Sequence, residues 1–94
     1  MAANSRAEVE MIVLNRLAQL TQYSNPKPTS EIKDWFKKVE KHDTDTGAPV
    51  HRTDLFVYYT LQDVGGTATL GAAQLIGGKF KTVKQLVDHL EATR

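Results

Sequence analysis

The chain has 94 residues, of which 40% are hydrophobic and 24% are charged, a composition typical of one soluble globular domain and unlike that of a disordered tail. Twelve Lys and Arg residues nearly balance eleven Asp and Glu residues, so the formal net charge of +1 creates no overall field that would hold nucleic acid or an anionic membrane. The absence of cysteine excludes disulfides, thiolate nucleophiles, iron–sulfur clusters and cysteine-based zinc sites.

The N-terminal part of the chain is predicted to form an amphipathic helix over residues 6–20, preceded by a disordered segment over residues 1–5. The apolar residues recur at the spacing of one helical face: Val9, Ile12, Val13, Leu17 and Leu20. Pro26 and Pro28 then end the pattern, because proline lacks an amide donor and forces the preceding residue toward extended geometry. Acidic residues within the first ten positions stand where a secretory signal would carry its apolar core, so we expect the protein to be cytoplasmic.

A second helix is predicted to start at Thr29 or Ser30. Its apolar positions again follow helical spacing: Ile32, Trp35, Phe36 and Val39. Residues 42–50 come next, and their Asp, Thr, Gly and Pro content predicts the longest loop of the chain. Loops of this length often carry function, which makes this segment a candidate site.

Two central segments are ambiguous. Residues 54–64 contain β-branched and aromatic residues that suit a buried strand, but Thr53 can cap a helix, and we favour a helix that ends at a pair of glycines. Residues 69–76 can form a short helix, or residues 73–76 can pair with residues 79–83 across a two-glycine turn. The sequence leaves both possibilities open.

The last segment, residues 82–92, carries the strongest helical signal. Thr82 and Gln85 have the spacing of a capping box, in which each side chain accepts a hydrogen bond from the other residue's backbone amide. Val83, Leu86, Val87 and Leu90 form the apolar face. We therefore expect a mainly α, single domain over residues 1–94, a bundle of four to five helices without a membrane span. The alternative is a winged helix–turn–helix with a short β-hairpin at about residues 67–83.

The loop after the second helix partly matches a calcium-binding loop. Asp43, Asp45 and Asp54 stand at positions one, three and twelve of a pattern that resembles EF-hand and dockerin loops. Gly47 replaces the oxygen ligand of position five, and the bidentate glutamate of position twelve is absent. We therefore favour a polar loop that caps two helices, and we expect neither a metal nor a cofactor.

Lysines cluster along the second predicted helix and again before the last one. If the central segments formed a recognition helix and a hairpin, Arg52 would lead the recognition helix and the second lysine group would lie in the wing. This alternative predicts nucleic-acid binding by Arg52, Lys37, Lys38, Lys79 and Lys81. The simpler interpretation is a solvated lysine face.

The C-terminal forty or so residues resemble the latter half of acyl and peptidyl carrier proteins. Residues 80–90 match the last helix of that family, Thr-Val-x-x-Leu-Val-x-x-Leu, and Thr53, Asp54 and Leu55 stand about where its attachment triplet would lie. The resemblance implies a helical bundle. The family attaches phosphopantetheine to a serine, and Asp54 stands at that position, so the resemblance allows at most a noncatalytic, carrier-like domain.

No nucleophile constellation, dense metal-ligand set or phosphate loop is present in the sequence, so we expect no enzyme activity. We expect instead a non-enzymatic protein-interaction module, such as a small regulatory, inhibitory or phage component, with another protein as its partner. The surface residues proposed for this contact are Phe56, Tyr58, His51 and Arg52.

Overall fold

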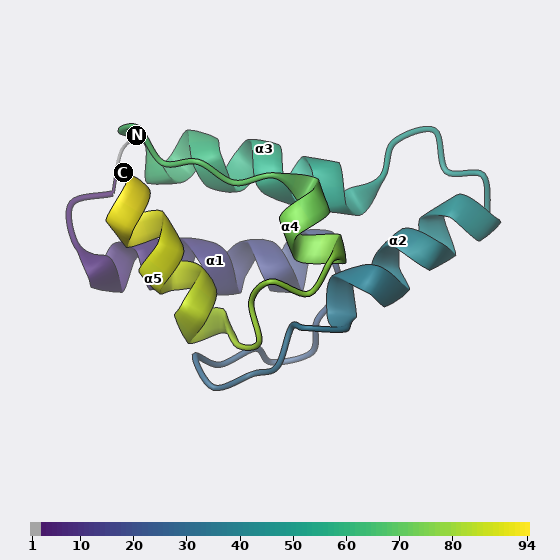
Figure 1. The fold of residues 1–94 in the computed structure, drawn as a ribbon, viewed down its shortest axis with the longest axis horizontal. Coiled ribbons are helices and arrows are strands. Elements are labelled where there is room, and N and C mark those ends of the chain that lie inside the picture. The colour runs from purple at the N-terminus through teal and green to yellow at the C-terminus, as the bar shows by residue number, and fades with distance from the viewer. Residues whose placement is uncertain (1–2) are drawn as a thin grey trace.

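The computed structural model describes residues 3–94, and this part of the chain folds into five helices without a β-strand (Figure 1). The helices are α1 (Arg6–Leu20), α2 (Trp35–Asp45), α3 (Arg52–Val64), α4 (Ala72–Ile76) and α5 (Val83–Thr93). The prediction of a small helical bundle is confirmed. The alternative hairpin at residues 67–83 is wrong, because residues 72–76 are helical and place Leu75 in the core.

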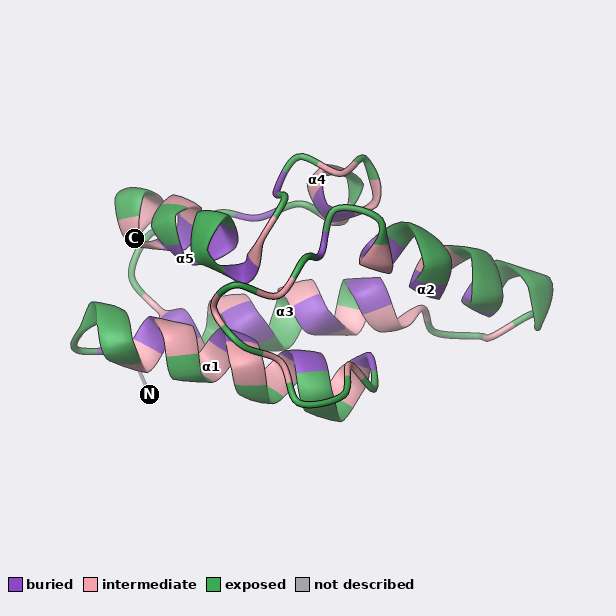
Figure 2. Ribbon diagram, turned by 90° about the horizontal axis from the view of Figure 1, so that it is seen from below, coloured by how far each residue is buried: buried purple, intermediate pink, exposed green. Residues whose placement is uncertain are grey.

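Two helices form the base on which the others pack. α1 and α3 run side by side in opposite directions, and α5 crosses at the end of the molecule that holds both termini (Figure 1). α2 packs against α3 and α4, and its C-terminal end extends away from the bundle as a mostly exposed arm (Figure 2). The surface next to α2 therefore combines residues of α2 with residues of α3 and α4, which come later in the chain.

The core is built from the apolar faces that the sequence pattern predicts. Its fully buried side chains include Val9, Val13 and Leu17 of α1, Phe36 of α2, Phe56 and Val64 of α3, and Val83, Leu86, Val87 and Leu90 of α5. The rings of Phe36 and Phe56 lie 5.0 Å apart between centroids and join α2 to α3. Phe56 is thus a core residue, and its assignment to an exposed interaction surface is corrected.

The bounds of α2 differ from the predicted helix at both ends. Its start is delayed to Trp35 because residues 30–32 are extended and pair with the segment before α5: the Ile32 amide donates to the Lys81 carbonyl at 2.8 Å, and the Val83 amide donates to the Ser30 carbonyl at 3.0 Å. Its end moves to Asp45, so the first part of the predicted loop is helical.

The cap of α5 is formed in a modified way. The Thr82 hydroxyl accepts from the Gln85 amide at 3.4 Å, as predicted, but the Gln85 side chain accepts from the amide of Lys81, at 2.6 Å, and not from that of Thr82. The cap therefore also holds the extended segment that pairs with residues 30–32.

Within the segment expected to be disordered, Ala3 is packed against the bundle, Asn4 and Ser5 are exposed, and Met1 and Ala2 lie outside the described residues. Ala3 is buried, and its amide donates to the Val64 carbonyl at 3.1 Å. Its carbonyl accepts from the guanidinium of Arg94, and the Ser5 hydroxyl caps α1. No helix between residues 3 and 94 has the length and apolar character needed to cross a membrane.

Candidate functional site

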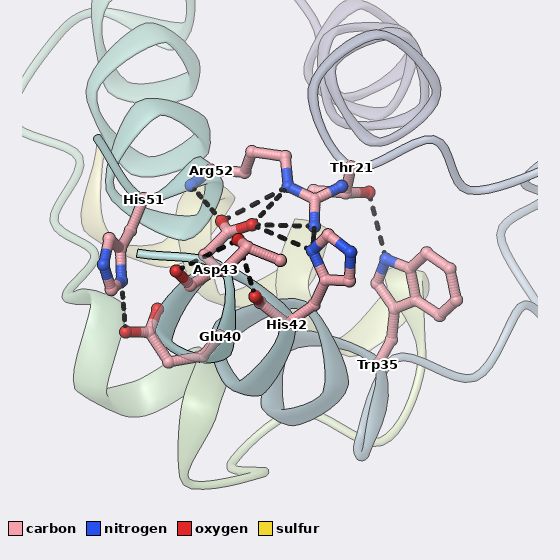
Figure 3. Close-up of polar contacts among 8 residues, drawn as sticks. Thr21, Trp35, Glu40, His42, Asp43, His51 and Arg52 are labelled. Carbon is pink, nitrogen blue, oxygen red and sulfur yellow. Dashed lines mark hydrogen bonds and ion pairs between the residues drawn. The ribbon is translucent and has the colours of Figure 1, made fainter. Parts of the chain in front are cut away.

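Asp43 and Arg52 form the central polar contact between α2 and α3 (Figure 3). The Asp43 carboxylate accepts from the backbone amide of Arg52 at 2.8 Å, and the Arg52 guanidinium donates to it at 2.8 Å. His51, the N-cap of α3, makes no side-chain capping bond, so Asp43 caps this helix from a neighbouring helix. The hydrogen bond from Arg52 lowers the pKa of the buried Asp43 carboxyl from 3.8 to about 2, against the opposing effect of burial.

The calcium-loop hypothesis does not fit this arrangement. Asp43 is engaged by Arg52, whereas Asp45 forms an ion pair with Lys41 at 2.7 Å. Asp54, which also stands at the position of the carrier-protein serine, is exposed in the first turn of α3. Between residues 3 and 94, no three His, Asp or Glu side chains gather in a way that could hold a metal ion.

Two histidines flank the Asp43–Arg52 pair on opposite sides (Figure 3). His42 Nδ1 lies 3.2 Å from an Arg52 guanidinium nitrogen and 3.5 Å from the Asp43 carboxylate, so it accepts from the former or donates to the latter according to which ring nitrogen carries the proton. His51 Nδ1 lies 2.6 Å from the Glu40 carboxylate, and both side chains are half-buried. The two residues predicted for interaction at this point, His51 and Arg52, thus have structural partners of their own.

Trp35 lies beside this network at the start of α2. Its indole N–H donates to the Thr21 hydroxyl at 3.0 Å, and the ring of Tyr23 packs edge-on against it at 4.8 Å between centroids. Two concavities adjoin the Trp35 ring, with volumes of about 270 and 370 Å³. The first is lined by Thr21, Gln22, Trp35, Lys38, Val39, His42 and Arg52. The second is lined by Tyr23, Glu31, Lys33, Asp34, Trp35, Lys38 and Lys81. Together they are called the Trp35 cleft below.

The charges of the two concavities differ. The lining of the first contains the cations Lys38 and Arg52 and no carboxylate. The lining of the second combines three lysines with two carboxylates: Lys33, Lys38 and Lys81 with Glu31 and Asp34. Within the described part of the chain, none of these three lysines forms an ion pair. The cleft is therefore a site of locally excess positive charge in a nearly neutral protein.

The lysines of the nucleic-acid hypothesis divide between this cleft and other surfaces. Lys38 and Lys81 line the cleft, together with Arg52. Lys37 is absent from both linings and lies 3.9 Å from the Asp34 carboxylate, whereas the Lys79 ammonium lies 5.7 Å from the centroid of the Phe80 ring. The winged-helix arrangement that would have joined Lys79 to Arg52 is not formed.

One wall of the cleft has an unfavourable backbone conformation. Gln22 has φ of +59°, in the left-handed region, and the amides on both sides of it, those of Thr21 and Tyr23, donate to the Leu17 carbonyl. This geometry ends α1 in the way that usually requires glycine. The sequence pattern assigned Trp35 to the core face and contained no signal that the end of α1 would form a cleft with it.

Tyr58, the remaining residue of the predicted interaction surface, is 63% exposed on α3. It contacts Tyr59 edge-on at 5.2 Å, and the Arg16 guanidinium lies 5.0 Å from the centroid of the Tyr59 ring. Tyr58 is absent from the lining of the Trp35 cleft, so the residues predicted as one surface are divided among the core, α3 and the cleft.

No protein-family model, curated protein or solved structure matches this chain.

Proposed function

We propose that the protein is a non-enzymatic protein-interaction module that receives a segment of a partner protein in the Trp35 cleft, and that it acts as a regulatory component in the cytoplasm. The observation that carries this proposal is the pair of adjoining concavities that share Trp35 and Lys38. A groove of this size accommodates a few side chains of a partner and is bordered by polar groups that can orient them.

The construction of the cleft supports binding. Tryptophan and arginine are the residues that most often dominate the energy of protein interfaces, and Trp35 and Arg52 both contribute to the lining. The hydroxyl of Thr21 and the ring of Tyr23 hold the Trp35 side chain in place. A partner would therefore lose little free energy in ordering this side chain.

The polar groups of the cleft favour a binding role over catalysis. The Asp43 carboxylate accepts from the Arg52 side chain, and His42 Nδ1 lies within contact distance of both Arg52 and Asp43, which leaves neither as an available general base at those atoms. The hydroxyl in the first concavity, that of Thr21, donates to the Leu17 carbonyl and accepts from Trp35. It lacks the adjacent base that would activate it as a nucleophile.

Site-specific photo-crosslinking in the cells that produce the protein tests this proposal. A photoreactive phenylalanine analogue at Lys33, an exposed residue in the lining of the second concavity, should give a discrete crosslinked protein. The same group at Lys37, which is exposed but outside both linings, serves as the matched control. Equal crosslinking patterns at the two positions, or no protein crosslink at Lys33, would contradict the proposal.

A second candidate function is the binding of single-stranded nucleic acid. It is favoured by the presence of Lys38, Lys81 and Arg52 around the Trp35 ring. Bases stack on aromatic rings, and phosphates pair with cations. Trp35 is the single tryptophan of the chain, so its fluorescence reports directly on the cleft. Titration with a short oligonucleotide at low and high salt tests this candidate, since phosphate contacts weaken steeply as salt increases.

A further inference from the structure

We infer that the partner segment of the Trp35 cleft is acidic: a carboxylate enters the first concavity and pairs with Lys38, and a neighbouring apolar side chain packs on Trp35. This inference rests on the proposed function and adds the chemistry of the partner to it. It follows from the distribution of charge in the two concavities.

The first concavity is suited to a single carboxylate. The charged groups in its lining are Lys38 and Arg52, and the carboxylate of Asp43, which neutralises Arg52, is buried away from the lining. The Lys38 ammonium has no ion-pair partner in the described residues. A partner carboxylate would supply that missing charge and would accept hydrogen bonds from Lys38 and from the remaining donors of Arg52.

The same concavity offers an apolar surface beside its cations. Val39, which is only 4% exposed, and the half-buried Trp35 belong to its lining, so Trp35 is the more accessible of the two. Because the indole N–H is already donated to Thr21, Trp35 presents ring carbons to an occupant and not a hydrogen-bond donor. An apolar side chain next to the acidic residue therefore matches this part of the lining.

The second concavity favours a peptide over a nucleic-acid strand. Glu31 and Asp34 line it together with the lysines, so a strand that continued with regularly spaced phosphates would meet like charge there. A peptide can place one acidic residue in the first concavity and a neutral or basic residue in the second. Charge complementarity thus supports an acidic peptide with a limited number of carboxylates.

Selection from a library of random twelve-residue peptides, built without tryptophan, tests the inference on the full chain. The selected peptides are synthesised, and binding is followed by Trp35 fluorescence and by backbone NMR shifts. The Lys38→Glu variant should bind the selected peptides about tenfold more weakly. The Lys37→Glu variant, with the same change of charge outside the cleft, should bind within about twofold of the unmodified protein. Circular dichroism checks that both variants are folded.

The outcomes separate this inference from the proposed function. Enrichment of Asp or Glu beside an apolar residue, with the expected effect of Lys38→Glu, supports both. If the peptides that bind at Trp35 lack acidic residues, or bind the Lys38→Glu variant equally well, the inference of an acidic partner is overturned. The proposal of an interaction module then stands. If no peptide binds at Trp35, both are overturned, and oligonucleotide binding at that residue would replace them with the nucleic-acid candidate.

Discussion

Asp43 accepts hydrogen bonds from both the backbone amide and the guanidinium of Arg52, nine residues further along the chain. A single buried carboxylate on α2 thereby caps α3 and neutralises the cation at its first residue. Such a contact links helix-end stabilisation to the packing of two helices. Removing this contact should therefore lower the stability of the whole fold and not only that of the first turn of α3.

Lowering the pH should reduce the stability of the fold by protonating the Asp43 carboxylate. The pKa of Asp43 is lowered to about 2 in the folded protein from 3.8, so its stabilising effect is complete above pH 4 and is lost as pH falls toward 2. The free energy of unfolding should drop by roughly 2 kcal/mol over this window from Asp43 alone. Urea unfolding at pH 5 and pH 2 measures the change. The Asp43→Asn variant should be less stable at pH 5 and should lose less stability than the unmodified protein on acidification; equal losses would contradict the assignment.

A buried hydroxyl on α3 should be replaceable with a gain in stability. Thr60 is fully buried, and its hydroxyl has no hydrogen-bond partner among residues 3–94. Thr60→Val removes the desolvated polar group at nearly constant volume and should raise the free energy of unfolding by about 1 kcal/mol. Chemical denaturation provides the measurement.

Two other threonines provide controls for that substitution. Thr44→Val, at an exposed position of α2, should change stability by less than about 0.5 kcal/mol. Thr21→Val should destabilise by about 1 to 3 kcal/mol and alter Trp35 fluorescence, because the Thr21 hydroxyl accepts from the Trp35 indole. If all three valine variants gained stability alike, the explanation by an unpaired hydroxyl would be incorrect.

The end of α1 should become more stable when glycine replaces Gln22. The φ of +59° at this position is unfavourable for a residue with a side chain, and glycine removes that cost. We expect Gln22→Gly to increase the free energy of unfolding by about 0.5 to 1 kcal/mol, measured by thermal or chemical denaturation. Ala18→Gly, at an exposed position inside α1, should instead lower it by about 1 kcal/mol. A loss of stability in both variants would show that Gln22 is held by its side chain.

The sequence alone determined most of the helical architecture. The apolar faces of α1 and α5 follow from local spacing, and the predicted cap at Thr82 lies within one turn of the helix that it starts. Such signals are local, because backbone hydrogen bonds and side-chain positions in a helix repeat over three to four residues. The cations Lys38, Lys81 and Arg52 were predicted as binding residues only together with Lys37 and Lys79, in the winged-helix alternative.

The contacts that bring those residues together come from the packing of the helices. The delayed start of α2 depends on pairing between residues 30–32 and 81–83, and α4 formed in place of a hairpin strand because Leu75 is buried against the other helices. The Trp35 cleft combines the end of α1, the face of α2, the first residue of α3 and Lys81. No spacing within any one of these segments specifies contacts across the chain, since those arise only when the helices pack on a shared core.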